Sequence, residues 1–144
     1  MKFRPPIWLV CLLLLALTAG CSLTKGKEPA SVASATLTDQ VDEKTKAPLR
    51  SLTSFPTGSK VIFISTLIKN PQTGTKVEAQ WFYDKERKGN FLPVDTATVN
   101  FDEASRDKYV AYSLQAAETF PDGTYKVQIW VDGKMAKEIT FTVG

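Results

Sequence analysis

Histidine is absent from the 144 residues of this chain, and cysteine occurs only twice, at Cys11 and Cys21. Without histidine, the chain lacks the commonest general base, the commonest neutral metal ligand and the usual switch near neutral pH. Cys11 lies inside an N-terminal apolar run, so a chain cut after that run keeps one cysteine and forms no internal disulfide. Catalysis by a Ser-His-Asp or Cys-His arrangement is therefore excluded.

Strong charge of one sign is also missing. The net charge of +3 includes Lys2 and Arg4 at the extreme N-terminus, and without them 16 basic residues face 15 acidic ones. A domain so close to neutral lacks the excess of basic residues that is typical of nucleic-acid-binding domains. The glycines are scattered and the acids show no calcium-loop spacing, so we expect no cofactor, no metal and no catalytic residue. An enzyme built on a carboxylate pair or a Ser–Lys pair stays open as an alternative.

Long apolar runs are missing as well. Residues 7–17 form the longest one and follow the basic start, but a permanent membrane span needs about 20 residues. A basic start, a short apolar segment and small residues at its end predict a secretory signal peptide over residues 1–20. We therefore expect no permanent membrane-spanning helix in this part of the chain.

The end of this segment, Leu17-Thr18-Ala19-Gly20-Cys21, resembles the lipobox of bacterial lipoproteins, although Thr18 stands where leucine is usual. The resemblance implies that Cys21 is acylated and holds the protein on a membrane. Ser22 after the cysteine implies the outer membrane, facing the periplasm, in a Gram-negative cell. In a Gram-positive cell the anchor would lie on the outer face of the plasma membrane. The alternative is an ordinary signal peptide cut near Ala19, which releases a soluble protein.

Residues 21–34 are rich in Ser, Thr, Lys, Ala and Pro, a composition typical of a flexible tether. Residues 35–144 then carry apolar and β-branched segments separated by turn residues, and we expect no long helix there. One edge strand is predicted near residues 35–41. Stronger strands are predicted at residues 60–68, 76–83, 92–101, 109–114 and 125–131, and a last one carries Ile139, Phe141 and Val143. Six or seven short strands predict an all-β sandwich of two antiparallel sheets.

The last two strands allow a sharper prediction. A two-residue turn at Asp132-Gly133 would pair Val127 with Glu138, which sets an apolar face against a charged one. A shift of one residue pairs Val127 with Ile139 instead, and a one-residue slip turns every side chain over. We therefore predict a three-residue loop or a bulge, and no simple two-residue turn.

Pro121-Asp122-Gly123-Thr124-Tyr125 resembles the corner of immunoglobulin-like and fibronectin-type domains, where a tyrosine hydroxyl caps the turn. More broadly, residues 52–143 resemble an Ig-like domain of small bacterial lipoproteins of unassigned activity. The matching pieces are Ser54-Phe55-Pro56, residues 74–83 around Trp81, and Pro121-x-Gly123-x-Tyr125. The resemblance implies a seven-stranded Ig-like sandwich with Trp81 in its core, and it implies no chemistry.

Phe82 and Trp130 are the candidate partner-binding residues. The alternation places both on the face opposite the core of two strands that neighbour each other in an Ig-like sheet, with Gln80 and Gln128 beside them. Aromatic side chains among polar ones are typical of partner-binding surfaces, although the N-terminal segment or residues 35–54 could cover the rings. We therefore expect a non-enzymatic envelope module that binds a protein through this face or a sheet edge. The alternative is a module that binds envelope glycan or a small molecule. The charged run 85–88 is interpreted as a hairpin tip, with contact to anionic lipid or peptidoglycan as its alternative.

Overall fold

The computed structural model describes residues 27–144. The predicted signal peptide and Cys21 lie outside these residues. Between residues 27 and 144 no helix has the length and apolarity to cross a membrane. Eight strands make up this part of the chain: β1 (Ser31–Thr38), β2 (Ser54–Phe55), β3 (Val61–Lys69), β4 (Lys76–Asp84), β5 (Leu92–Asn100), β6 (Asp107–Gln115), β7 (Gly123–Val131) and β8 (Lys134–Val143).

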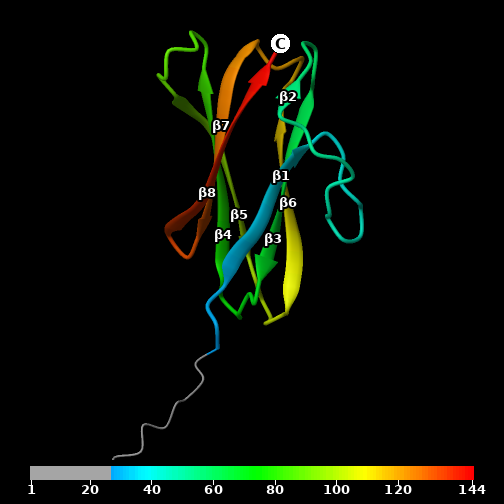
Figure 1. Cartoon of the computed structure of the whole chain (residues 1–144), viewed down its shortest axis with the longest axis vertical. Helices are drawn as coiled ribbons and strands as arrows, with labels where there is room; N and C mark the ends of the chain where they lie inside the picture. Colours follow the sequence, from blue (N-terminus) through cyan, green and yellow to red (C-terminus); the bar gives the residue numbers. More distant parts are fainter. Residues whose placement is uncertain (1–26) are drawn as a thin grey trace, which may run out of the picture.

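The strands form two sheets that face each other along the long axis of the molecule (Figure 1). The smaller sheet has the order β1-β3-β6, and the larger has the order β2-β8-β7-β4-β5. The pairing is antiparallel except between β2 and β8. The predicted all-β sandwich of two sheets is confirmed.

Two predicted boundaries differ from the observed ones. Strand β1 begins at Ser31, so residues 31–34, which were assigned to the tether, belong to a sheet. The strand also ends at Thr38 rather than near residue 41. The short strand β2 was not predicted, because two residues carry no periodicity. Strands β3 to β7 lie within two residues of their predicted ranges, and β8 contains the predicted Ile139, Phe141 and Val143.

The core lies between the two sheets and is built by alternate residues of each strand. Trp81 of β4 is fully buried, and its indole packs edge-on against Phe141 of β8 with ring centroids 6.3 Å apart. Ile62, Ile64 and Ile68 of β3 close the core from the opposite sheet. The predicted burial of Trp81 is confirmed.

The outward face of β3 is only partly covered, although its sequence is apolar on both faces. Phe63 and Leu67 point away from the core and are half-buried. The segment between β1 and β2 folds over part of this face, where the hydroxyl of Ser65 donates a hydrogen bond of 2.7 Å to the carbonyl oxygen of Lys46. A strand that is apolar on both faces is thus covered on one side by a sheet and on the other by a loop.

Tyr125 forms the predicted corner. Its hydroxyl donates a hydrogen bond of 2.8 Å to the carbonyl oxygen of Pro121, and its ring stacks on Phe141 at 5.4 Å. Burial, assisted by the hydroxyl of Tyr83 and the carboxylate of Asp122, raises the pKa of Tyr125 to about 12. The hydroxyl therefore stays protonated and keeps donating its bond at neutral pH.

The hairpin between β7 and β8 contains both a two-residue turn and a bulge, which were predicted as alternatives. Val131 pairs with Lys134 across a two-residue turn, in which Asp132 and Gly133 have φ values of 49° and 80°. Positive φ at both positions is the type I′ turn that suits a hairpin. A bulge at Ala136 then shifts the register, so that Val127 pairs with Ile139. The predicted bulge and apolar pairing are confirmed, and the predicted absence of a two-residue turn is wrong.

Candidate partner surface

The two predicted aromatic residues share one face but do not touch. Strands β4 and β7 are neighbours, and along them Phe82 pairs with Lys126, Gln80 with Gln128, and Glu78 with Trp130. All six side chains point away from the core and are half-buried. Phe82 and Trp130 are thus four residues apart along the strands, or about 13 Å at about 3.3 Å per residue. The surface predicted as one patch is divided into two ends.

The glutamine row between these ends is held by its own hydrogen bonds. The amide nitrogen of Gln80 donates to Oε1 of Glu78 at 2.6 Å, and that of Gln128 donates to Oε2 of Glu138 at 2.6 Å. The indole nitrogen of Trp130 donates to Oε1 of Gln128 at 3.3 Å. These side chains hydrogen-bond to one another, and they form a polar row that separates Phe82 from Trp130.

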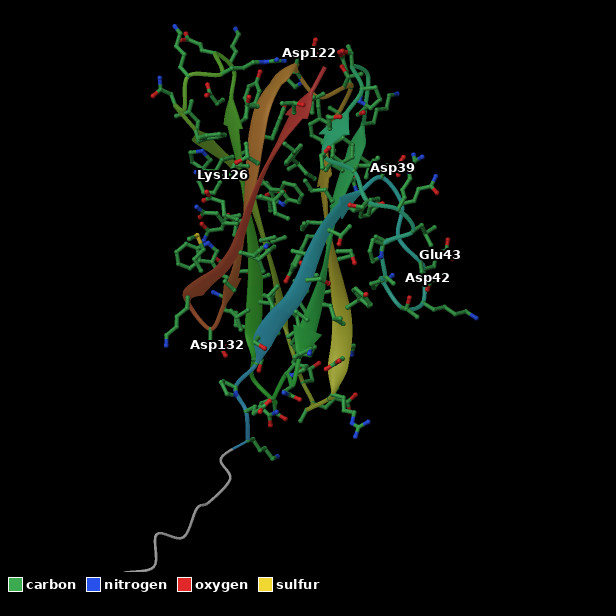
Figure 2. All side chains as sticks on the ribbon, in the orientation of Figure 1. Asp39, Asp42, Glu43, Asp122, Lys126 and Asp132 are labelled. Atoms are coloured by element: carbon green, nitrogen blue, oxygen red, sulfur yellow. The ribbon has the colours of Figure 1, made fainter. Side chains whose placement is uncertain are left out.

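Lys126 of the neighbouring strand β7 lies over the ring of Phe82. The ammonium of Lys126 lies 5.1 Å from the ring centroid of Phe82 and 4.5 Å from that of Phe91. It also lies 3.7 Å from Oε2 of Glu138. Figure 2 shows Lys126 on the larger sheet, away from the loop that carries Asp39, Asp42 and Glu43. The cover over Phe82 therefore comes from Lys126 of β7. Residues 35–38 and Lys46 lie against the smaller sheet, and Ser54 pairs with β8 on the far side of β7.

Two aliphatic residues at the start of β5 are far more exposed than the predicted aromatics, and the first of them, Leu92, pairs with Tyr83 on the face opposite Phe82. Leu92 is 70% exposed and Val94 is 52% exposed. Both lie at the start of the edge strand β5, where Pro93 pairs with Phe82 and a bulge leaves Val94 without a partner on β4. At the Trp130 end, the corresponding exposed residue is Met135.

The loop that joins β4 to β5 is ordered by a buried carboxylate. Asp84 is 2% exposed, and it accepts hydrogen bonds from the backbone N–H of Glu86 at 3.1 Å and of Gly89 at 2.6 Å. Arg87 has a φ of 56°, a conformation that a non-glycine residue adopts only where its surroundings hold it. The backbone of the loop therefore holds a defined conformation, from which its charged side chains extend.

We call the group at this end of β4 and β5 the tip patch: the exposed Lys85, Arg87, Leu92 and Val94, together with the half-buried Phe82 and Phe91. Figure 1 places the β4–β5 loop at the end of the molecule opposite the start of β1. Phe82 and the charged run 85–88 were predicted from the sequence, whereas the exposure of Leu92 and Val94 was not. The proline between them is a signal that could have found them, since proline within a strand marks an edge.

The cavities of the domain lie elsewhere. Four of them are lined entirely by described residues, and neither Phe82 nor Trp130 lines any of the four. One of about 600 Å³ lies between residues 44–47 and 107–109. Another, of about 410 Å³, lies where β5 and β6 diverge. Residues 27–144 also contain no cluster of three acidic or other metal-ligating side chains. None of these four cavities is lined by a residue of the tip patch.

No protein-family model matches this chain, and no curated protein matches it in sequence. Among solved structures, an immunoglobulin-like protein of Pseudomonas aeruginosa is similar with a TM-score of 0.53 and 12% identity, over 83% of this chain and 99% of that one. An alkylpurine DNA glycosylase of Pseudomonas fluorescens gives 0.42 and 10%, over 79% of this chain and 30% of its own. A Niemann-Pick type C2 protein of the Japanese carpenter ant gives 0.39 and 14%, over 82% and 93%.

The first of these likenesses concerns the fold alone, and the other two carry no argument. Together with the two sheets, the buried Trp81 and the corner at Tyr125, it agrees with the architecture described for Ig-like sandwiches. The described part of the chain is an immunoglobulin-like β-sandwich.

Proposed function

We propose that this protein is a lipid-anchored module of the bacterial envelope, with Cys21 as the acylated residue, and that its Ig-like domain binds a partner protein through the tip patch. One observation carries the proposal: Leu92 and Val94, two residues apart at the start of the edge strand β5, are 70% and 52% exposed. Exposed apolar groups rimmed by polar ones are typical of protein-binding surfaces.

The geometry of the domain suits an anchor at its N-terminal side. Strand β1 begins at the end opposite the tip patch (Figure 1), so a chain tied down at Cys21 directs the tip patch away from the membrane. Residues 22–30, fully extended, reach at most about 30 Å. Each buried CH₂ of an acyl chain contributes about 0.8 kcal/mol, so two or three chains hold the protein firmly. In a Gram-negative cell the domain would stand in the periplasm.

A non-enzymatic role fits the chemistry better than catalysis. The whole chain has no histidine, and no cluster of three metal-ligating side chains occurs within residues 27–144. The alternative of a glycan or small-molecule site calls for a pocket lined by aromatic residues. Phe82 lines none of the four cavities described, which favours a protein partner over such a ligand.

The anchor makes a direct prediction. A Cys21→Ala variant should move from the membrane fraction to the soluble fraction, because it has no thiol to acylate. A Ser22→Ala variant, which keeps the thiol, should stay with the membranes. The measurement is fractionation of cells, together with the mass of the N-terminal peptide. A Cys21→Ala protein that still sediments with membranes would contradict the anchor.

The docking surface makes a second prediction. A Leu92→Ser, Val94→Ser variant should lose the partner complex recovered from solubilised envelopes, while its free energy of unfolding changes by less than about 1 kcal/mol because both sites are exposed. A Thr96→Ser, Thr98→Ser variant of the same strand is the matched control and should keep the complex. Retention of the complex by the first variant would remove the tip patch from the interface.

A further inference from the structure

We infer that the domain has a second binding surface, separate from the tip patch: the free edge of β6 pairs with an extended segment of another protein, and one bulky apolar side chain of that segment enters the cavity between β5 and β6. This inference goes beyond the proposed function and does not depend on it. It follows from the hydrogen bonding of β6, from the regularity of its edge, and from the cavity beside it.

Strand β6 uses the backbone groups of only every second residue. Within residues 27–144 it is an edge strand that pairs with β3 alone. Just beyond one end of this pairing, the N–H of Ala116 donates to the carbonyl oxygen of Lys60 at 3.0 Å, and beyond the other end the N–H of Asn70 donates to that of Arg106. Because hydrogen-bonded pairs alternate with non-bonded ones in an antiparallel ladder, the even-numbered residues of β6 bond to β3. The odd-numbered residues direct their N–H and C=O groups away from β3.

Tyr109, Ala111 and Ser113 are the odd-numbered residues in the middle of this strand. In the part of the chain that the structure describes, their N–H and C=O groups make no hydrogen bond to the backbone of another strand or loop. Together they form a row of donors and acceptors along the edge of the smaller sheet. An extended peptide backbone is the chemical group that matches such a row.

The edge of β6 lacks the features that protect the edges of β1 and β5. The nine residue pairs between β6 and β3 follow one another without a bulge, and β6 contains no proline. In β5, Pro93 and the bulge at Val94 interrupt the edge, and β1 has a bulge between Val32 and Ser34. Bulges and proline hinder the addition of another strand. The edge of β6 is therefore open to strand addition.

The cavity of about 410 Å³ lies beside the same edge. Its apolar lining comes from Val99 of β5, from Phe101 just after β5 and from Val110 of β6. The other lining residues are polar: Asn100, Asp102, Glu103 and Lys108. A strand added to β6 places the side chain opposite Val110 on the same side of the sheet as Val110, which is the side of the cavity. The volume falls in the range of about 300–1,000 Å³ that is typical of sites for a bound group.

An extended segment of another protein suits this place better than a second copy of the chain. If two β6 strands paired with each other, the side chain opposite Val110 would be an inward-pointing one of the second β6. The apolar candidates, Tyr112 and Leu114, are buried in their own core, where the hydroxyl of Tyr112 donates to the carbonyl oxygen of Val77 at 2.7 Å. They are not available to a neighbouring cavity. The occupant must therefore bring an apolar side chain that its own fold leaves free.

The test uses the protein purified from envelopes in a non-ionic detergent and the synthetic peptide Lys-Thr-Val-Thr-Phe-Thr-Val-Thr-Lys. Hydrogen exchange is measured at each backbone amide of β6. In the protein alone, the amides of Tyr109, Ala111 and Ser113 should exchange quickly, whereas those of Val110 and Tyr112 should exchange slowly because they bond to β3. The peptide should slow exchange at the first three residues and leave the other two as they were. Absence of this alternation, or of protection by the peptide, would overturn the inference.

Changes to the peptide separate the side-chain contact from the backbone contact. Alanine in place of phenylalanine should weaken binding by about tenfold or more, because a large apolar side chain then no longer fills the cavity. N-methylation of the two threonines beside the phenylalanine should abolish binding, since their N–H groups face β6 in an antiparallel pairing. N-methylation of the phenylalanine, whose N–H points away from β6, is the matched control and should leave binding unchanged. Equal binding of all four peptides would contradict the inference.

A variant of the edge makes the same test from the side of the protein. Ala111→Pro removes an N–H that makes no bond to β3, and proline is tolerated on edge strands where its nitrogen faces solvent. The variant should lose peptide binding, whereas Ala111→Ser should keep it. A folded Ala111→Pro protein that binds the peptide as well as Ala111→Ser does would overturn the inference. If Ala111→Pro does not fold, the N-methylated peptides decide.

Two further outcomes separate this surface from its alternatives. The Leu92→Ser, Val94→Ser variant should bind the peptide unchanged, and loss of the peptide by that variant would show that the edge is not a separate surface. Protection of the Ala111 amide in the protein alone, if it disappears on dilution, would assign the edge to a second copy instead. If the peptide fails to bind but the Leu92→Ser, Val94→Ser variant still loses its complex, the inference about β6 is wrong and the proposed function stands.

Discussion

Replacement of Trp81 by alanine should lower the free energy of unfolding by about 3–5 kcal/mol. This is a large share of the total of about 5–15 kcal/mol that is typical of a domain. The indole is fully buried between the sheets and packs against Phe141, so its removal leaves a cavity that the rigid strands on either side cannot close. The measurement is equilibrium unfolding in urea.

Trp130 provides the matched control for this prediction. It is the same residue type on a neighbouring strand, but it lies half-buried on the outward face. Its replacement by alanine should cost only about 1 kcal/mol, as is usual for sites outside the core. A Trp130→Ala variant as unstable as Trp81→Ala would show that the two faces of the larger sheet are assigned wrongly.

Replacement of Asp84 by alanine should lower the free energy of unfolding by about 1.5–3 kcal/mol, the contribution typical of a hydrogen bond to a charged group. The carboxylate is buried and accepts the N–H groups of both Glu86 and Gly89. Asp84→Asn retains one acceptor oxygen and should lose less. Unfolding in urea measures the cost, and hydrogen exchange at residues 86–90 measures the loosening of the loop.

The same substitution connects stability to function. If the loop presents Lys85 and Arg87 from a fixed frame, Asp84→Ala should also weaken partner binding under conditions where the domain remains folded. Asp102 is exposed in a loop at the other end of the molecule, and Asp102→Ala should change neither property. An Asp84→Ala protein with full stability and full binding would refute the structural role assigned to this carboxylate.

Much of the fold could be predicted because its signals are local. The alternation around Trp81 identifies the buried face of β4, and the segment from Pro121 to Tyr125 identifies the corner. The hairpin at Asp132-Gly133 shows the limit of such reasoning. Pairing of apolar faces correctly required a one-residue shift, but the shift is made by a bulge at Ala136, beyond the turn. Nothing in the local pattern distinguishes these two places.

The candidate site was less predictable for the same reason. The outward direction of Phe82 and Trp130 follows from the alternation of each strand, whereas their separation depends on the register between β4 and β7, which are far apart in the sequence. The exposure of Leu92 and Val94 depends on β5 being an edge strand with a bulge. That position is decided by tertiary pairing, so the sequence indicated the aromatic end of the surface but not its most exposed part.

A crosslinking scan of the protein in its native envelope tests the central claim most directly. A photoreactive amino acid is placed in turn at positions 85, 92 and 94 of the tip patch, and at positions 98, 134 and 137 of the same sheet. The account predicts one shared adduct at the three tip positions and none at the other three. An adduct that forms at positions 98, 134 or 137 but not at 92 and 94 would contradict it.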